Sequence, residues 1–367
     1  MKILADGIIY SLQKKGGISR YFCELFKAIK KIDSTVKVHM FNSLPTYTPS
    51  KIAFFKNSLH NHFLAYYLSQ QYSGIFHSSY YTFYPSLKIP QIVTVYDLIY
   101  EKFPQDFSQP LEYLFVKQKK STIESADKII CISEAVKRDV IKYYQVKENK
   151  LVVTHLGISP IFKKILSKSI KQKFLKENKL NKAFVLYVGK RSKYKNFNCL
   201  ALAFSKIKKS FPADMACVGG GNFSEKEISF LRKLKILEKV RLFPTVTDQQ
   251  LVFFYNCAQA LIVPSLDEGF GLPILEAMAS GCPAIVSDIP VFREIAGNIP
   301  TYFNPADVSS ISRSIQAVLT KADSINYSLL ARKLAKKYTW ERTAQKTLDI
   351  YKQLDKRKNE NYQHYYS

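Results

Sequence analysis

The sequence predicts an α/β protein made of two doubly wound, Rossmann-like halves that face each other across a cleft. Three observations indicate this fold class. The chain has 367 residues, more than one compact core usually serves. Short apolar runs alternate with helical patterns, which is typical of parallel sheets covered by helices. A lysine-rich stretch interrupts the alternation near the middle of the chain, after which the alternation starts again.

The first half is expected to span residues 1–160. Its strands are predicted from apolar runs at Lys2–Ala5, Val36–Phe41, Gly74–His77, Gln91–Tyr96, Lys128–Ile132 and Lys150–Thr154. A helix is expected after Gly16-Gly17, because the apolar residues that follow fall on one helical face. Two further helical patterns cover Leu111–Ser125 and Glu134–Tyr144.

Residues 161–182 are predicted to link the halves, since Gly157–Lys182 holds many lysines and few strand signals. The second half is expected over 183–338. Its strands are predicted at Ala183–Val188, Ala213–Val218, Val240–Phe243, Ala260–Val263, Pro283–Val286 and Thr301–Phe303. Its helices are predicted at Phe197–Lys208, Glu225–Leu237, Asp248–Cys257, Ile274–Ser280, Val308–Thr320 and Ile325–Lys337. A last helix at Trp340–Leu354 and a polar tail complete the prediction.

The charge of the chain favours an anionic partner. Lysine and arginine number 55 against 29 acidic residues, for a net charge of +26. Nucleic acid, a phospholipid surface and a phosphorylated substrate all fit such an excess, and so does a lysine-rich but ordinary solvated surface. We expect no nucleic-acid partner, because no zinc-finger, RRM or KH signature accompanies the charge.

The sequence predicts a cytoplasmic location. The six cysteines include no CxxC pair and most lie in apolar runs, so we interpret them as buried thiols in a reducing compartment. No apolar stretch approaches the roughly 18 residues of a membrane span. We expect no signal peptide, because Asp6 interrupts the first apolar run.

The stretch Ala260–Asp288 carries the strongest functional signal. It predicts a strand, a loop with Gly269 and Gly271, a short helix and a second strand. Such a unit directs loop amides and a helix N-terminus at an anionic group. Glu268 in the loop and Glu276 in the helix suit a ligand that carries hydroxyls on either side of phosphates. From this pattern alone, an ordinary βαβ unit with two solvated glutamates is equally compatible.

The residues around the two glutamates resemble a known family. Glu268-Gly-Phe-Gly-Leu-Pro followed by Glu276-Ala-Met-Ala-Ser-Gly-Cys-Pro closely resembles the E-x7-E signature of the retaining glycosyltransferases of family 4, which have the GT-B fold. The match continues without a gap through Ser287-Asp288 and Glu294-Ile-Ala-Gly297. By analogy with that fold, we expect the C-terminal helix, within 339–367, to pack back on the first half.

The resemblance implies a donor site for a nucleotide-diphosphate sugar, with no cofactor. Tyr187-Val-Gly189-Lys-Arg191 and Lys195-Asn196 are similar to the family's G-x-R-x-x-x-K-N element, whose cations hold the diphosphate, so we expect Arg191 and Lys195 in that role. Glu268 is expected at the sugar hydroxyls and Glu276 at the ribose. The remaining predicted donor-binding residues are Gly16, Gly17, Gly189, Gly269, Phe270, Gly271 and Leu272.

Alternatives stay open for parts of this site. Gly16-Gly17-Ile-Ser-Arg-Tyr is similar to the family's GGI-x-RY element, but it also fits a plain strand-to-helix turn. On the acceptor side, the strand that ends in Tyr96-Asp97 resembles one that ends in His-Asp in the family. Asp97 suits either acceptor or sugar hydroxyls, or a helix N-cap. We expect no metal, because the chain has no Asp-x-Asp pair to hold one against a diphosphate.

The predicted function is retaining hexosyl transfer, with mannose from GDP-mannose as the first assignment. The predicted acceptor is a lipid-linked glycan or a lipopolysaccharide or O-antigen intermediate. The lysine-rich segment and Tyr66–Tyr84 suit a peripheral contact with an anionic membrane, on the inner face of the cytoplasmic membrane. The alternatives are a UDP-sugar donor (glucosyl, galactosyl or N-acetylhexosaminyl), a non-catalytic relative suggested by Tyr96, and a nucleic-acid-binding basic protein.

Overall fold

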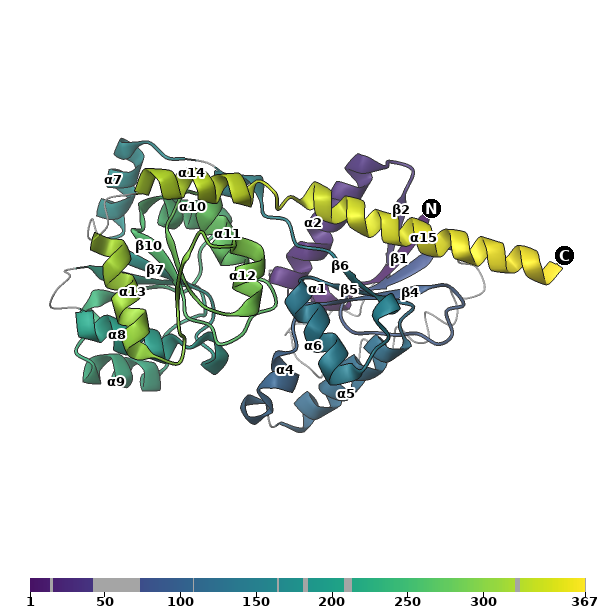
Figure 1. Ribbon diagram of the computed structural model, residues 1–367, viewed down its shortest axis with the longest axis horizontal. Helices are drawn as coiled ribbons and strands as arrows, with labels where there is room; N and C mark the ends of the chain where they lie inside the picture. Colours follow the sequence, from purple (N-terminus) through teal and green to yellow (C-terminus); the bar gives the residue numbers. More distant parts are fainter. Residues whose placement is uncertain are drawn as a thin grey trace. The chain divides into compact units, whose positions relative to one another are not determined.

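The computed structural model describes residues 1–367 apart from 14–15, 42–72, 108, 164, 181–183, 208–212, 321–323 and 367. The chain divides into two compact units (Figure 1). Unit 1 comprises Met1–Gly157 and Thr339–Ser367, and unit 2 comprises Ile158–Tyr338. Each unit contains one six-stranded sheet, and the neighbouring strands of both sheets are parallel. The predicted α/β class with two doubly wound sheets is therefore confirmed.

The sheet of unit 1 has the strand order β2-β1-β3-β4-β5-β6. Its strands are β1 (Lys2–Asp6), β2 (Lys37–Phe41), β3 (Ile75–Ser78), β4 (Gln91–Val95), β5 (Lys128–Cys131) and β6 (Leu151–Val153). The order changes direction between β1 and β3. In parallel α/β sheets, ligands bind outside the carboxyl ends of the strands near such a reversal.

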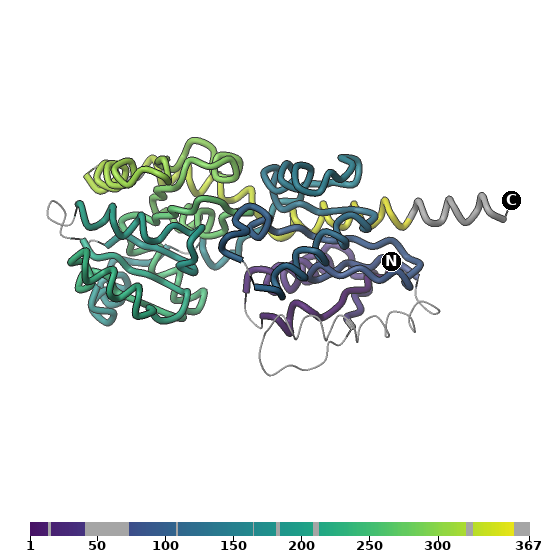
Figure 2. The backbone as a smooth tube through the Cα atoms, turned by 90° about the horizontal axis from the view of Figure 1, so that it is seen from below, coloured from purple at the N-terminus to yellow at the C-terminus, as the bar shows by residue number. Residues whose placement is uncertain are grey.

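The helices of unit 1 include one from the far end of the chain. They are α1 (Ile8–Leu12), α2 (Gly17–Ile32), α4 (Ile99–Lys102), α5 (Pro110–Ser125), α6 (Glu134–Tyr144) and α15 (Trp340–Tyr366). Helix α15 lies beside α2. In Figure 2 the yellow part of the trace crosses the same unit as the purple N-terminal segments. His77 of β3 contacts the Tyr351 hydroxyl of α15 at 2.5 Å, so α15 reaches the sheet.

The sheet of unit 2 has the order β12-β11-β10-β7-β8-β9, with its reversal between β7 and β10. Its strands are β7 (Phe184–Val188), β8 (Asp214–Val218), β9 (Val240–Phe243), β10 (Ala260–Val263), β11 (Ala284–Ser287) and β12 (Thr301–Phe303). The central strands β7 and β10 are apolar along their whole length, because a parallel sheet is covered by helices on both faces.

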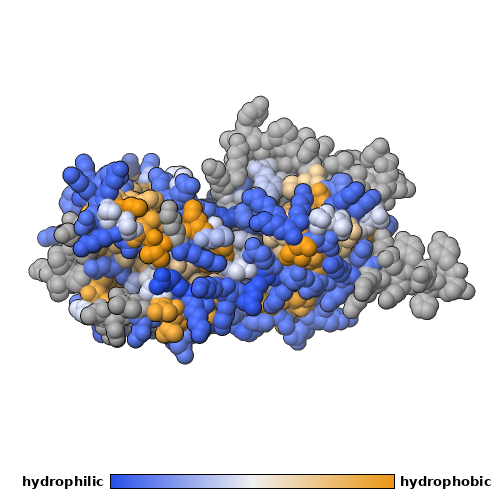
Figure 3. Space-filling model, turned by 90° about the horizontal axis from the view of Figure 1, so that it is seen from above, coloured by the Kyte–Doolittle hydropathy of each residue, from blue (hydrophilic) through white to orange (hydrophobic). Residues whose placement is uncertain are grey.

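Helices cover both faces of this second sheet (Figure 1). They are α7 (Lys168–Glu177), α8 (Phe197–Ile207), α9 (Glu225–Lys233), α10 (Asp248–Cys257), α11 (Leu272–Ala279), α12 (Pro290–Ala296), α13 (Val308–Thr320) and α14 (Ser324–Ala335). The core on one face joins β7, β8 and β10 to α8 and α13, with Leu200, Phe204 and Ile311 buried among them. On the face shown in Figure 3, apolar side chains form separate patches among hydrophilic ones.

The structure differs from three expectations. Residues 161–182 belong to unit 2, because Phe174 of α7 packs on Phe253 and Phe254 of α10, with ring centroids 5.3 and 5.0 Å away. Helix α15 continues to Tyr366 rather than ending at Leu354. Cys23 is exposed on α2, so not all the thiols are buried. Within the described residues, no helix is long and apolar enough to cross a membrane.

Candidate functional site

The carboxyl ends of β7 and β10 bring together Lys195 and Glu268, two of the predicted site residues. Lys195 ends a short 3-10 helix after β7, and its Nζ lies 2.5 Å from Oε1 of Glu268 in the loop after β10. The Ser265 hydroxyl donates to the same oxygen at 2.8 Å. The two side chains are 23% and 15% exposed, so a ligand can reach both. This ion pair stands at the sheet's reversal point, where ligands bind in such folds.

Backbone geometry fixes the loop that carries Lys195. Gly189 has a φ of +134°, which favours glycine, and its N–H donates to the Val218 carbonyl at 2.9 Å. Asn196 follows Lys195 with a left-handed φ of +58°, and its side-chain amide donates to the Pro305 carbonyl at 2.8 Å. The Leu266 N–H donates to the Tyr194 carbonyl at 2.7 Å, which joins the loops after β7 and β10.

The glycine loop before α11 is held by packing. Phe270 is buried and its ring packs edge-on against Tyr338, with the ring centroids 5.9 Å apart. Gly271 caps α11 with a φ of +104°, and a Cβ there would lie 2.9 Å from the Phe292 ring. Helix α11 starts at Leu272, as proline at its second position allows. Phe270 and Gly271 therefore shape the loop that presents Glu268, with the Phe270 side chain turned into the core.

Glu276 lies one turn into α11 and is 6% exposed. The Tyr255 hydroxyl of α10 donates to Glu276 Oε2 at 3.0 Å. Burial, and then the charge of Glu276, raise the pKa of Tyr255 well above its ordinary value. Tyr255 therefore stays a neutral donor that fixes the orientation of the carboxylate. Tyr255 could not be predicted from the sequence, because nothing in the pattern of α10 separates it from an ordinary core tyrosine.

Arg191 stands at the same edge but faces into unit 2. Its Nε donates to Glu227 Oε1 at 2.6 Å, and its terminal nitrogens donate to the carbonyls of residues 219–222. Its side chain is only 4% exposed. Although burial opposes it, hydrogen bonds from Ser224 and Arg191 hold the pKa of Glu227 below its ordinary range. The run of three glycines at 219–221, directly after a strand, is the sequence signal that could have revealed this contact.

In unit 1, Gly16 and Gly17 begin α2, as the sequence predicts for a loop-to-helix start. Gly16 caps the helix, and its N–H donates to the Ser19 hydroxyl at 2.9 Å. Gly17 is the first residue of the helix, and the space where a Cβ would lie is open. The geometry leaves room beside the first turn of α2.

Tyr96 and Asp97 differ in exposure. Tyr96 is buried, with its ring edge-on against Tyr21 and Tyr81, so it belongs to an aromatic cluster of the core. The Asp97 carboxylate accepts the Ile99 N–H at 3.3 Å, but the N-cap of α4 is Leu98, so Asp97 is not the helix cap that the sequence allowed. The Asp97 carbonyl accepts from Lys119 Nζ at 2.7 Å.

Lys119 of α5 stabilises the loop after β4, which contains Asp97. It forms an ion pair with Glu101 at 3.0 Å, and the two side chains are 1% and 5% exposed. The Tyr144 hydroxyl donates to the same carboxylate. Sequence reasoning missed this ion pair, because the lysine sits among many others in a basic chain and 18 residues separate it from Glu101.

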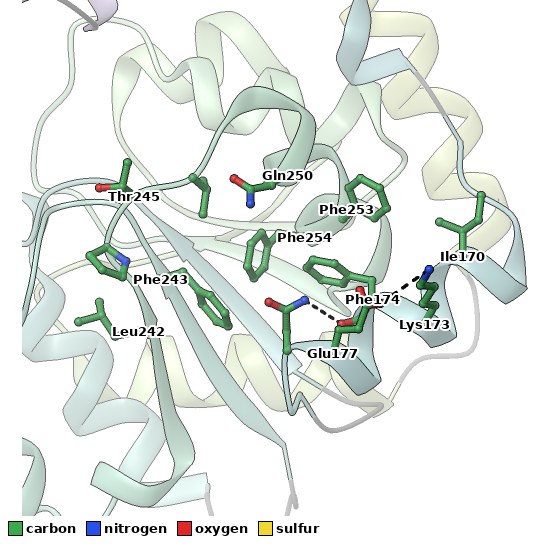
Figure 4. A pocket seen from close by; sticks show the side chains of 13 residues that line it. Ile170, Lys173, Phe174, Glu177, Leu242, Phe243, Thr245, Gln250, Phe253 and Phe254 are labelled. Carbon is green, nitrogen blue, oxygen red and sulfur yellow. Dashed lines mark hydrogen bonds and ion pairs between the residues drawn. The ribbon is translucent and has the colours of Figure 1, made fainter.

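A hollow of about 570 Å³ lies away from these residues, between α7, α10 and the end of β9 (Figure 4). Phenylalanine rings from Phe174, Phe243, Phe253 and Phe254 line it, and it contains none of the predicted site residues. Within the described ranges, no group of three or more His, Cys, Asp or Glu side chains is placed to hold a metal ion.

Comparison with protein families matches both parts of the chain. Residues 15–161 match the model described as Glycosyltransferase Family 4, and residues 169–338 match that of Glycosyl transferases group 1. The O-antigen chain mannosyltransferase RfbU of Salmonella typhimurium is 32% identical over 240 residues. That alignment covers 64% of this chain and 63% of the relative, slightly less than two thirds of the relative's length.

Solved structures share the fold. The sucrose-phosphate synthase of Thermosynechococcus elongatus superposes with a TM-score of 0.75 and 17% identity, covering 96% of this chain and 99% of the other. Anabaena Alr3699/HepE in complex with UDP-glucose gives 0.74 and 15% identity, covering 95% and 99%. At these identities the likeness shows the fold alone, and it confirms the GT-B class expected from the motifs.

Proposed function

Since the chain belongs to the family 4 glycosyltransferases, we propose that it transfers a hexose from a nucleotide-diphosphate sugar with retention of configuration. The first assignment is mannose from GDP-mannose, and the acceptor is a lipid-linked glycan or a lipopolysaccharide or O-antigen intermediate. The name of the Salmonella relative, an O-antigen chain mannosyltransferase, supports mannose as the transferred sugar and an O-antigen intermediate as the acceptor.

The observation that carries the proposal is the Lys195–Glu268 pair at the reversal of the second sheet. An ammonium is a compact charge with three N–H donors, so Lys195 can attract phosphate oxygens while it holds Glu268. The second Glu268 oxygen can accept from sugar hydroxyls while Ser265 and Lys195 hold the first. One pair thus contacts both the leaving diphosphate and the transferred ring.

The reaction breaks the bond between the sugar C1 and the diphosphate oxygen and forms a bond from C1 to an acceptor oxygen on the same face. The acceptor hydroxyl loses its proton, and we assign no side chain as its base. Negative charge develops on the diphosphate as the bond breaks, so a fixed cation beside it stabilises the transition state more than the ground state. Lys195 supplies that charge.

The other predicted contacts stay predictions. Glu276, oriented by Tyr255, is proposed at the ribose hydroxyls. The amides near Gly17 and Gly269–Gly271 are proposed at the phosphates, and Asp97 at the acceptor. The structure with UDP-glucose among the fold relatives favours a second candidate donor, a UDP-sugar.

Release of free nucleotide from a panel of sugar donors tests the proposal. The panel contains GDP-mannose, UDP-glucose, UDP-galactose and UDP-N-acetylglucosamine, with wild type and Glu268→Ala compared in each. We expect one donor to be consumed by wild type and its turnover to fall about 100-fold or more in Glu268→Ala, as for loss of a transition-state contact. Retention is read from the anomeric configuration of the product.

Two results would contradict the proposal. Consumption of none of the donors, even with a lipid-linked acceptor present, would remove the transferase assignment. If Glu268→Ala turned over the donor as fast as wild type, the assignment of Glu268 to the donor site would be wrong. Lys193→Ala, a change at a neighbouring exposed lysine, is the matched control and should turn over like wild type.

We also propose a cytoplasmic protein in peripheral contact with an anionic membrane. The supporting feature is the net charge of +26. Of the two segments predicted for this contact, residues 66–72 lie outside the described residues, whereas α7 exposes Ile170 beside several lysines. Flotation with phosphatidylglycerol vesicles at low salt should recover the protein, and its absence from the vesicle fraction would contradict the contact.

A further inference from the structure

The two ends of unit 2 lie next to each other. The unit begins at Ile158 and ends at Tyr338, so the chain enters it from unit 1 at the first residue and leaves it at the second. The Ile158 N–H donates to the Tyr338 carbonyl at 3.2 Å, which ties the two ends together. Each end also contacts a residue that supports one of the two glutamates proposed at the donor.

The entry segment, residues 158–163, supports Glu276 through Tyr255. The Phe162 ring is fully buried and lies edge-on against the Tyr255 ring, with the centroids 5.9 Å apart. Tyr255 in turn donates to the Glu276 carboxylate at 3.0 Å. The hydroxyl of Ser280, at the end of α11, donates to the Phe162 carbonyl at 2.9 Å, so the segment is also fixed to the helix that carries Glu276.

The exit residue, Tyr338, supports the loop of Glu268 through Phe270. Its ring lies edge-on against the Phe270 ring, with the centroids 5.9 Å apart, and its hydroxyl donates to the Ile295 carbonyl of α12 at 2.9 Å. The Ile295 side chain also closes off Gly271, because a Cβ there would lie 3.1 Å from Ile295 Cδ1. The loop that presents Glu268 is therefore packed between Tyr338 and α12.

We propose that Phe162 and Tyr338 are positioning residues, which hold Glu276 at the ribose hydroxyls and Glu268 at the transferred sugar. A hydrogen bond weakens steeply when its distance or angle departs from the optimum, so a binding carboxylate needs a packed support behind it. The two segments that join the units supply that support, one for each glutamate. This inference rests on the proposed function, since it takes a nucleotide sugar as the ligand of both glutamates.

Positioning and plain core packing differ in what they predict. If the two rings only stabilise unit 2, their loss affects both glutamates alike. If they position the glutamates, each variant changes the contact of one glutamate and leaves that of the other as in wild type. The ribose contact is read from nucleotide affinity, whereas the sugar contact is read from turnover at saturating donor.

The ribose contact is measured by calorimetry with UDP and GDP and with their dideoxy analogues, which lack both ribose hydroxyls. We expect wild type to bind one of the natural nucleotides about tenfold or more tightly than its analogue, and Phe162→Leu to reduce that preference by about threefold or more, as for a lost or weakened hydrogen bond to a carboxylate. Tyr338→Leu should keep the wild-type preference.

A double variant tests whether Phe162 acts through Glu276. In Glu276→Gln the preference for the ribose hydroxyls is already reduced, so adding Phe162→Leu should reduce it no further. A further loss in the double variant would show that the ring acts elsewhere, and the positioning role would be wrong. Phe162→Met, which removes the ring but fills similar space, takes its place if Phe162→Leu does not fold.

The sugar contact is measured as kcat with the donor that wild type consumes. We expect kcat of Tyr338→Leu to fall about tenfold or more, because a small misplacement of a group at the reacting centre is costly. Tyr338→Phe keeps the ring against Phe270 and should recover most of that loss. Phe162→Leu should raise KM and leave kcat near that of wild type.

Phe204→Leu is the matched control, because Phe204 is an equally buried phenylalanine on α8 that contacts neither glutamate. It should keep both the ribose preference and kcat. If it lost them as much as the two test variants, the effects would reflect a general loss of packing and the inference would be wrong. Circular dichroism and the thermal midpoint show whether each variant is folded.

The outcomes also distinguish this inference from the proposed function. If wild type prefers a natural nucleotide, but folded Phe162→Leu keeps the full preference or folded Tyr338→Leu keeps wild-type kcat, the positioning role of that residue is wrong and the donor assignment stands. If wild type binds neither UDP nor GDP and consumes no sugar donor, both the inference and the proposed function are wrong.

Discussion

Two Lys–Glu pairs stand after sheet strands of the two units, and they differ in exposure. In unit 1, Lys119 and Glu101 are sealed under the loop after β4, at 1% and 5% exposed. In unit 2, Lys195 and Glu268 are 23% and 15% exposed at the sheet reversal. A sealed pair has exchanged water for protein partners and can hold a loop, whereas an open one can also bind a ligand. The same chemistry therefore serves structure in one unit and, we propose, catalysis in the other.

The largest expected effect comes from removing the buried Lys119–Glu101 ion pair. Lys119→Met leaves the buried Glu101 carboxylate without its cation, and we expect unit 1 to lose about 3–5 kcal/mol of unfolding free energy. The single tryptophan, Trp340, belongs to unit 1, so its fluorescence during urea unfolding reports on that unit. The double variant Lys119→Met/Glu101→Gln should recover part of the loss. A change below 1 kcal/mol would show that the pair is not structural.

The open pair is tested by Lys195→Ala. We expect kcat/KM for the sugar donor to fall about 100-fold or more, because the cation that stabilises the leaving diphosphate is lost. The unfolding free energy should change little, since a partly exposed ion pair contributes at most about 1 kcal/mol. If Lys195→Ala lost stability but kept its turnover, the exposed pair would be structural and the proposed difference between the two pairs would be wrong.

Acidification sharpens the contrast. Burial of His77 beside Tyr351 and Thr94 lowers its pKa from 6.5 to about 3. The unfolded chain then binds a proton that the folded chain does not, so the free energy of unfolding of unit 1 should fall as the pH drops from about 6.5 towards 3. The slope is at most about 1.4 kcal/mol per pH unit.

Asp6 also contributes to the pH dependence of stability, and its contribution must be distinguished from that of His77. Burial raises the pKa of Asp6, which gives the opposite sign at acid pH. The difference between wild type and His77→Gln, followed by Trp340 fluorescence from pH 7 to 4, isolates the histidine. A variant with the same pH slope as wild type would contradict the assignment.

The smallest expected effect concerns Tyr96. Tyr96→Phe keeps the ring packed between Tyr21 and Tyr81, so we expect transfer to stay within about twofold and stability within about 1 kcal/mol. Asp97→Asn is the comparison, because that side chain is only half-buried. A tenfold fall in Tyr96→Phe would place its hydroxyl on the acceptor.

Much of unit 2 could be predicted from the sequence. The motif from Glu268 to Glu276 is gapless, and its glycine and proline positions dictate one strand, loop and helix. The ion pair with Lys195 could not be predicted, because 73 residues separate it from Glu268 and only the pairing of β7 with β10 joins them. The contacts of Glu227 and Tyr255 could not be predicted either, because each residue meets its partner only in the folded unit.

The contacts of unit 1 were harder to predict from the sequence, because its polar groups are buried and form hydrogen bonds with one another. Asp6 at the end of β1 accepts from Ser79, Thr82 and Tyr84, and His77 contacts a residue 274 positions away. No local pattern marks such contacts, since each partner looks like an ordinary core or loop residue. The substitution of tyrosine for the family's histidine was visible at position 96, but its burial against Tyr21 was not.

The return of α15 to unit 1 has a consequence for synthesis on the ribosome. Strand β3 and helix α2 emerge early, yet Tyr351 and Trp340, which pack on His77 and Tyr21, emerge only after all of unit 2. Unit 2 is continuous in sequence and can complete its core first, while the N-terminal sheet still lacks the contacts that α15 makes with it. Unit 1, whose strands are synthesised first, therefore completes its folding only when α15 has been synthesised.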